Sequence, residues 1–314
     1  MKLQDYHIIP YSESYHDKVC ALEQGIVQGR KIQLEIIKAN FLDRANIFKN
    51  HYSCIAVTNE NEVVGSAIGA QTTVMINRQQ SAVGIAFDTK VDPCSRGRGI
   101  GKAMVRDIYT KFYNPMGLRK NLMVAKQSNS AVVKLASKAV HNIWFYDFVY
   151  LTIPTSNRVE IPASASRTLQ LLSIQLFDEH SLPGEFYSTL QNGLSYFETH
   201  KLYRLKIKNI NWFYKQGISF LKLVDEKYRS LPGENETLSL ATLFNHTPEN
   251  IHEINQVLEE LRSKDIKQLL VCCRRNDYIY RVLKKASINQ YQYNLVSDFH
   301  IDRSDQVAID VRCL

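Results

Sequence analysis

Extended, largely apolar segments alternate with helical periods through the first half of the chain. After the glycine-rich turn near residue 99, apolar residues recur every four positions, which predicts a helix with one buried face. That face consists of Ile100, Met104, Ile108 and Phe112. The predicted elements in order are strands over 52–57, 63–76 and 83–91, the helix from Ile100, a strand over 122–125, a helix opened by Asn129, and a strand over 144–153.

The second half has a similar alternation. The run Thr247-Pro248-Glu249 has a capping residue before a proline at the first helical position, which predicts the start of a helix. The apolar face of that helix comprises Ile251, Ile254, Val257, Leu258 and Leu261. The other predicted elements are strands over 218–224, 238–244 and 269–273, a helix over 278–286, and strands over 291–299 and 307–311.

The two halves also share a stretch of sequence. Residues 120–129 resemble residues 267–276 at an offset of 147, and Lys138-Ala139 falls on Lys285-Ala286 at the same offset. A repeat of this length predicts tandem α/β domains of one fold, each with a mixed sheet, although chance matching of two strand–helix units is the alternative. The predicted boundaries are a first domain over 1–155, a linker over 156–170 and a second domain over 171–314.

Composition fits this organisation. A length of 314 residues suits two domains, and 45% hydrophobic with 22% charged residues is typical of a globular protein. No run approaches the roughly 20 apolar residues of a membrane span, and residues 1–5 have no signal-peptide character. The six cysteines include no Cys-x-x-Cys pair, so we expect no metal and a cytoplasmic protein.

Positive charge is concentrated in the first half. Residues 1–155 contain 19 Lys and Arg against 12 Asp and Glu, whereas residues 156–314 contain 20 against 19. The first half therefore suits an anionic ligand. Nucleic acid is the competing interpretation, but no basic run with interleaved aromatics appears, and we expect no nucleic-acid partner.

The most informative segment is the turn over residues 91–102 between a predicted strand and a predicted helix. Glycines at such a turn let the backbone approach a ligand, and the helix N-terminus favours a phosphate. A Walker A loop is excluded because Ala103 follows Gly101-Lys102, and a Rossmann fingerprint is excluded because Lys102 replaces its third glycine. The pattern that fits is Arg-x-x-Gly-x-Gly, from Arg96 through Gly99 to Gly101.

This pattern resembles the coenzyme A pyrophosphate loop of the GNAT family of acyl-CoA-dependent N-acyltransferases. The resemblance covers roughly residues 5–155 and includes the segment Asn129-Ser130-Ala131 through Leu135 to Lys138; residues 122–150 are also similar to plant hookless-type proteins and bacterial relatives. In the second half, the 147-residue offset puts Leu243, His246 and Pro248 where Arg96, Gly99 and Gly101 stand, so a degenerate domain without the pyrophosphate loop is expected.

The resemblance implies an acyl-CoA site in a V-shaped opening between the strands at 83–91 and 122–125. Backbone groups of Thr89, Lys90 and Val91 would pair with pantetheine, Asn129 would face the pantetheine arm, and Lys134 or Lys138 would meet the 3′-phosphate or else lie on a solvated helix face. The pyrophosphate would bind the loop residues, which are Arg96, Gly97, Arg98, Gly99, Ile100, Gly101 and Lys102.

The catalytic groups are less defined. The family's strand base maps to Phe87 or Ile85, and its helix tyrosine maps to Ala136. None of these can exchange a proton, although Ile85 and Phe87 would favour an acyl group longer than acetyl, or simply pack in the core.

Glu23 and Asp88 are the candidate catalytic carboxylates, and strand alternation predicts that Asp88 faces away from Ile85 and Phe87. Structural roles for both carboxylates, or a water chain to a distant base, are the alternatives.

The expected function is N-acyl transfer from acetyl-CoA or a longer acyl-CoA to a primary amine of a small molecule, peptide or protein. The alternative is an inactive acyl-CoA-binding sensor or scaffold. The chain is expected to be a monomer or a homodimer.

Overall fold

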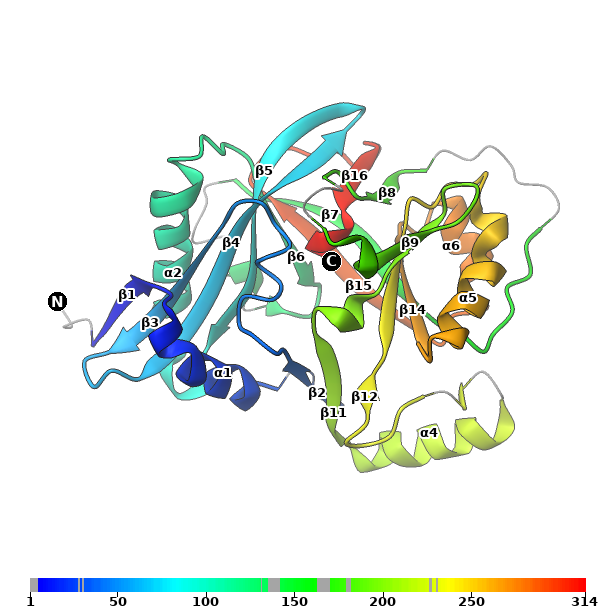
Figure 1. Ribbon diagram of the computed structural model, residues 1–314, viewed down its shortest axis with the longest axis horizontal. Coiled ribbons are helices and arrows are strands. Elements are labelled where there is room, and N and C mark those ends of the chain that lie inside the picture. The colour runs from blue at the N-terminus through cyan, green and yellow to red at the C-terminus, as the bar shows by residue number, and fades with distance from the viewer. Residues whose placement is uncertain are drawn as a thin grey trace.

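The structure is a computed structural model that describes residues 5–27, 29, 31–130, 132–134, 142–162, 170–178, 182–225, 228–229 and 231–314 (Figure 1). The elements of the first half are β1 (Tyr6–Pro10), α1 (His16–Gly25), β2 (Ile32–Ile37), β3 (His51–Thr58), β4 (Val63–Ile76), β5 (Gln79–Val91), α2 (Ile100–Ile108), β6 (Asn121–Lys126) and β7 (Trp144–Pro154).

In the second half, short strands precede a helix and a second strand–helix alternation. The elements are β8 (Leu172–Gln175), β9 (Tyr187–Thr189), β10 (Ser195–Phe197), β11 (Arg204–Ile210), α4 (Trp212–Val224), β12 (Thr237–Leu238), β13 (Leu240–Phe244), α5 (Ile254–Ser263), β14 (Gln268–Cys273), α6 (Tyr278–Leu283), β15 (Asn289–Ser297) and β16 (Val307–Asp310).

One mixed sheet runs through both halves of the described chain. Its main order is β1-β3-β4-β5-β6-β15-β7-β14-β13-β10-β9, with β16 joined to β4 and β8. β15 lies between β6 and β7, and β7 in turn lies between β15 and β14. Each half therefore places a strand inside the sheet of the other, and the mixed α/β class predicted from the sequence is confirmed.

The two halves repeat a parallel strand–helix–strand unit. β5 and β6 are parallel with α2 between them in the chain, and β13 and β14 are parallel with α5 between them. A parallel pair needs such a crossover, and both helices bury an apolar face against the sheet. Ile100, Met104 and Ile108 of α2 are at most 2% exposed, as the period of four predicts.

The offset of 147 holds for only part of this repeat. β6 and β14 begin at Asn121 and Gln268, which are 147 residues apart. Their partners in the preceding strands are Gly84 and Leu240, which are 156 residues apart. The predicted equivalence of Arg96 with Leu243 was therefore wrong, since Leu243 lies inside β13. The turn after β13, over residues 245–250, still contains no glycine.

The prediction of a strand over 218–224 was wrong. These residues form the C-terminal part of the helix α4, whose first turn is capped by the Asn211 side chain accepting from the Phe213 N–H at 3.1 Å. A short apolar run does not by itself distinguish strand from helix. The aromatic and β-branched residues of this segment favoured a strand, although the segment is helical. In the chain, α4 lies between β11 and β12, two strands of a separate three-stranded sheet in the order β12-β11-β2. No helix in the described part of the chain is long and apolar enough to cross a membrane.

The junction of β5 and β6 is tightly packed at Gly84. A Cβ atom added there lies 2.7 Å from the ring of Tyr113, which is 1% exposed, and also overlaps the Asn121 side chain. We expect Gly84→Ala to lower the free energy of unfolding by about 1–3 kcal/mol through overpacking, measured by urea denaturation. Gly184→Ala is the control because an added Cβ there meets nothing within 4 Å. Equal stability of the two variants would contradict this packing.

Candidate functional site

β5 and β6 separate soon after they meet. They pair only at Gly84 with Asn121 and at Ile85 with Leu122. β5 continues to Val91, while β6 pairs along its other edge with β15 over five residue pairs, from Leu122 to Lys126. The β6-facing edge of β5 is therefore left without strand pairing beyond Ile85. This is where the sequence predicts an opening.

A β-bulge interrupts β5 just beyond the point where it separates from β6. Against β4, Ile68 pairs with Phe87 and Ser66 with Lys90, so β5 carries one extra residue. Asp88 has a φ of +50°, a conformation that costs a non-glycine residue free energy. In the bulge, Thr89 has a buried hydroxyl with no hydrogen-bond partner among the described residues.

The bulge also changes the face to which Asp88 points. The Arg44 guanidinium lies 4.8 Å from the ring centre of Phe87 and 3.3 Å from Asp88 Oδ1. Asp88 and Phe87 thus lie on the same side of the sheet. The prediction that Asp88 faces away from Phe87 was wrong because the extra residue breaks the strand alternation.

A buried ion cluster surrounds Asp88. Lys38 Nζ lies 2.5 Å from Asp88 Oδ2 and 3.2 Å from Glu23 Oε1, so one lysine joins the two carboxylates predicted from the sequence. Lys90 Nζ lies 2.8 Å from Glu23 Oε1. The five members of this cluster are Glu23, Lys38, Arg44, Asp88 and Lys90.

The cluster determines how Asp88 titrates. Burial alone would raise the pKa of Asp88, but Lys38 and Arg44 outweigh burial and lower this pKa to about 2. For Lys38, burial opposes the charged form, and Asp88 with Glu23 outweighs it, so the pKa of Lys38 is raised. Asp88 is therefore ionised and accepts protons weakly near neutral pH. The proposed catalytic use of Glu23 and Asp88 remains a prediction.

The glycine turn joins this strand to α2. Asp92 accepts a hydrogen bond from the Ser95 N–H at 3.1 Å, and Gly97 and Gly99 have φ values of +82° and +87°. Gly99 is the N-cap of α2, and the Ala103 N–H donates to its carbonyl. The N–H groups of residues 100–102 precede this first helical bond and are available to an anion.

The charged side chains of the turn have different positions. Arg96 Nε donates to the Val91 carbonyl at 3.2 Å and braces the turn. Arg98 pairs with exposed Asp5 at 2.6 Å, and Lys102 is exposed in the first turn of α2. Lys90 points into the ion cluster, so only its backbone is offered to a ligand.

The segment after β6 supplies a second helix start. Asn129 Oδ1 accepts from the Val132 N–H at 3.3 Å, so this side chain caps the helix. Lys134 is exposed on this helix, and its predicted contact with the 3′-phosphate stays a prediction. Lys138 and Ala136 lie outside the described residues.

Sequence reasoning missed Lys38, Arg44 and Tyr203 at the site. Arg44 donates to the backbone oxygens of Cys313 and Leu314, and lies 5.8 Å from the ring centre of Tyr203. The second half therefore covers the bulge of β5. The only sequence signal for Lys38 and Arg44 was their position as charged residues within the largely apolar segment 31–48. That position does not reveal which carboxylates they pair with.

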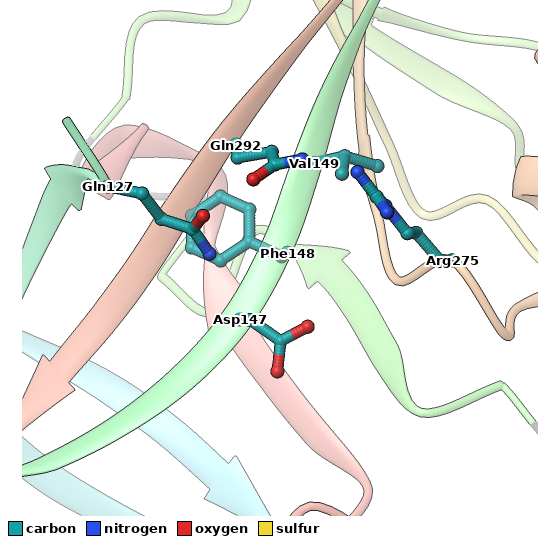
Figure 2. Close-up of a pocket in the computed structure, with 6 residues that line it drawn as sticks. All are labelled: Gln127, Asp147, Phe148, Val149, Arg275 and Gln292. Atoms are coloured by element: carbon teal, nitrogen blue, oxygen red, sulfur yellow. The ribbon is translucent and has the colours of Figure 1, made fainter.

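A small pocket lies over the central strands near the end of β6. Its volume is about 120 Å³, and Figure 2 shows Gln127 and Arg275 at opposite ends of it, with Asp147 and Gln292 between. Ligand pockets are usually several times larger, about 300–1,000 Å³, so this pocket is too small for an acyl-CoA. In the described residues, no group of three or more His, Cys, Asp or Glu is arranged to hold a metal.

Comparisons with known proteins support the fold. No protein-family model and no curated protein matches the chain. Among solved structures, N-myristoyltransferase of Saccharomyces cerevisiae with bound myristoyl-CoA and inhibitors is similar, with a TM-score of 0.59 and 10% identity over 96% of this chain and 82% of that one.

Another structure of that enzyme with bound myristoyl-CoA has a TM-score of 0.57 and 9% sequence identity, and the match covers 96% of this chain and 85% of that one. The chain therefore shares the mixed α/β fold of this N-myristoyltransferase along nearly its whole length.

The ion cluster predicts a pH-dependent stability. Because the pKa of Asp88 is lower when folded than its usual 3.8, its charge stabilises the fold above pH ~4, and this stabilisation is lost as pH falls toward 2. We expect Asp88→Asn to lower the free energy of unfolding by at least about 2 kcal/mol at pH 7, with a difference that narrows between pH ~4 and ~2.

Denaturant titrations of the wild type and the variant at several pH values measure this difference. The control is Asp5→Asn, which removes an exposed ion pair and should cost less than about 1 kcal/mol. A difference for Asp88→Asn that is constant with pH would contradict the ion-cluster account.

Proposed function

We propose that this protein is an acyl-CoA-dependent N-acyltransferase. The observation that carries the proposal is the separation of β5 from β6 directly beside a glycine turn at the start of α2. An extended ligand can pair with the free edge of β5 while its phosphates reach the helix N-terminus. Few ligands other than an acyl-CoA join a long flexible amide arm to a pyrophosphate.

The donor is bound along one path. The pyrophosphate lies at the backbone of residues 97–102, and the positive charge of the first half favours it. The pantetheine amides pair with backbone groups of Thr89 to Val91, next to the cap formed by Asn129. The thioester then lies at the bulge of β5.

The acyl chain extends toward the apolar side of the opening. Ile85 and Phe87 are 1% and 8% exposed and belong to the main apolar core. The solved relatives named above carry bound myristoyl-CoA, which supports a donor longer than acetyl.

The reaction is attack of a neutral amine on the thioester carbonyl. The amine nitrogen forms the new C–N bond, the oxygen becomes an oxyanion, and the C–S bond then breaks to release the thiolate of coenzyme A, which takes up a proton. A backbone N–H group in the bulge of β5 donates to the oxyanion. The amine proton leaves through solvent or a water chain, since Asp88 is too weak a base to take it.

The second half shapes the acceptor side in this proposal. The chain comprises an acyl-CoA domain over 1–155 and a second domain over 171–314 that retains the strand–helix plan without the glycine turn. Tyr203 and residues 313–314 meet Arg44 above the bulge, where an amine would enter.

One observation favours a second function, an acyl-CoA-binding sensor or scaffold without catalysis. Both carboxylates nearest the bulge are ion-paired, and no described side chain there is an evident base. Release of free coenzyme A from acyl-CoA, measured with a panel of amines and amino-terminal peptides, separates the two functions.

Substitution at the turn tests donor binding. Gly99→Glu adds a side chain at a φ of +87° and a negative charge at the pyrophosphate position. We expect a loss of acyl-CoA affinity of at least about 100-fold by isothermal titration calorimetry, with the fold retained by circular dichroism. Gly184→Glu adds the same charge in open space and serves as the control. Unchanged binding by Gly99→Glu would refute the donor site.

The length of the donor's acyl group tests the proposed contact with Ile85 and Phe87. Each buried methylene contributes about 0.8 kcal/mol, so octanoyl-CoA and myristoyl-CoA should bind at least about tenfold more tightly than acetyl-CoA. The same calorimetry with the three thioesters measures this ratio. Equal affinities, or a preference for acetyl-CoA, would show that Ile85 and Phe87 serve only the core.

A further inference from the structure

The helix α4 presents an apolar surface to solvent. Five of its side chains are the most exposed large apolar residues described in the chain: Trp212 at 64%, Phe213 at 76%, Phe220 at 63%, Leu223 at 83% and Val224 at 60%. At 100° per residue they lie within about 120° around the helix axis. We call these five residues the outer face of α4. Exposed apolar residues gathered in this way mark an interaction surface.

The helix is held in a fixed position. The Asn211 N–H donates to the Lys31 carbonyl at 2.8 Å, and Asn211 also caps the helix. Lys215 pairs with Glu234 at 2.7 Å, and Lys31 Nζ lies 4.8 Å from the ring centre of Tyr214. The opposite side of α4, with Ile218 and Leu221, is half-buried. Exposure of the outer face is therefore a property of the folded protein.

Positive charge accompanies the outer face. Residues 204–225 contain five Lys and Arg against one acidic residue, Asp225. The cations are Arg204, Lys206, Lys208, Lys215 and Lys222. Lys208 pairs with Glu35 at 3.0 Å and Lys215 with Glu234 at 2.7 Å, so the charges left for an anionic surface are those of exposed Arg204 and half-buried Lys206 and Lys222. A helix with aromatic and aliphatic residues on one side and lysines beside them has the chemistry of a helix at an anionic membrane surface.

We propose that α4 docks the protein on an anionic lipid bilayer, with the outer face buried among the headgroups and upper acyl chains. At 13 residues, α4 is shorter than the roughly 20 residues that span a bilayer, so it lies in the plane of the surface. This docking is independent of the acyl transfer proposed above.

One observation favours a lipid surface over another protein. Figure 1 shows α4 along the lower edge of the molecule, with no other labelled element beyond it. The side chains of a protruding helix can insert into the surface of a lipid bilayer, whereas a protein partner would need a groove that matches the helix.

The test uses the full chain with Trp144→Phe, which leaves Trp212 as the sole tryptophan. It is mixed with vesicles of phosphatidylcholine alone or with added phosphatidylserine. We expect a blue shift of Trp212 emission, quenching by brominated lipid, and co-sedimentation with the phosphatidylserine vesicles, all weakened by salt.

In the same background, Phe220→Glu with Leu223→Glu should weaken vesicle binding at least about tenfold. Met116→Glu with Phe145→Glu is the matched control, since both residues are 42% exposed and lie outside α4. Thermal unfolding verifies that both double variants are folded.

Three results would overturn the proposal. The first is no binding of the parent to anionic vesicles, and the second is equal binding by the two double variants. The third is a parent dimer, measured by light scattering, that the α4 variant abolishes, since the outer face would then bind a second copy. Acyl-CoA affinity, measured in parallel, is expected to be unchanged by the α4 substitutions, so failure of docking leaves the proposed enzyme function untouched.

Discussion

The pairing of β6 with β15 is the interaction on which the site depends. β6 forms two residue pairs with β5 and five with β15, a strand that comes from nearly 170 residues later in the chain. A strand held so much more firmly on one edge follows that edge, and β6 therefore leaves β5 beyond Ile85. The separation of β5 from β6 in the first half is thus maintained by a strand of the second half, and the two halves form one sheet.

The bulge in β5 lies in the stretch that this arrangement leaves without a partner on the β6 side. Asp88 adopts a positive φ at the free stretch of the strand, and Lys38 and Arg44 hold its carboxylate under cover of the second half. The same pairs keep the pKa of Asp88 low, so this carboxylate accepts protons weakly near neutral pH.

The glycine turn and the arm of β2, β11, β12 and α4 serve different contacts. The turn offers unpaired N–H groups to a phosphate and lies beside the opening. The arm has its own three-stranded sheet, separate from the large one, and the apolar residues of α4 point to solvent. The proposed acyl-CoA site and the proposed docking face therefore lie on different parts of the molecule.

The sequence by itself determined many of the local elements and the glycine turn. The period of four from Ile100 to Phe112, the strand over 63–76 and the pattern Arg96-x-x-Gly99-x-Gly101 depend on neighbouring residues alone, and local physics suffices for them. The helical state of residues 218–224 depended on the Asn211 cap, which a short apolar run does not reveal. The face of Asp88, its partners Lys38 and Arg44, and the insertion of β15 beside β6 were decided only by tertiary structure, because each joins residues far apart in the chain whose types do not indicate one another.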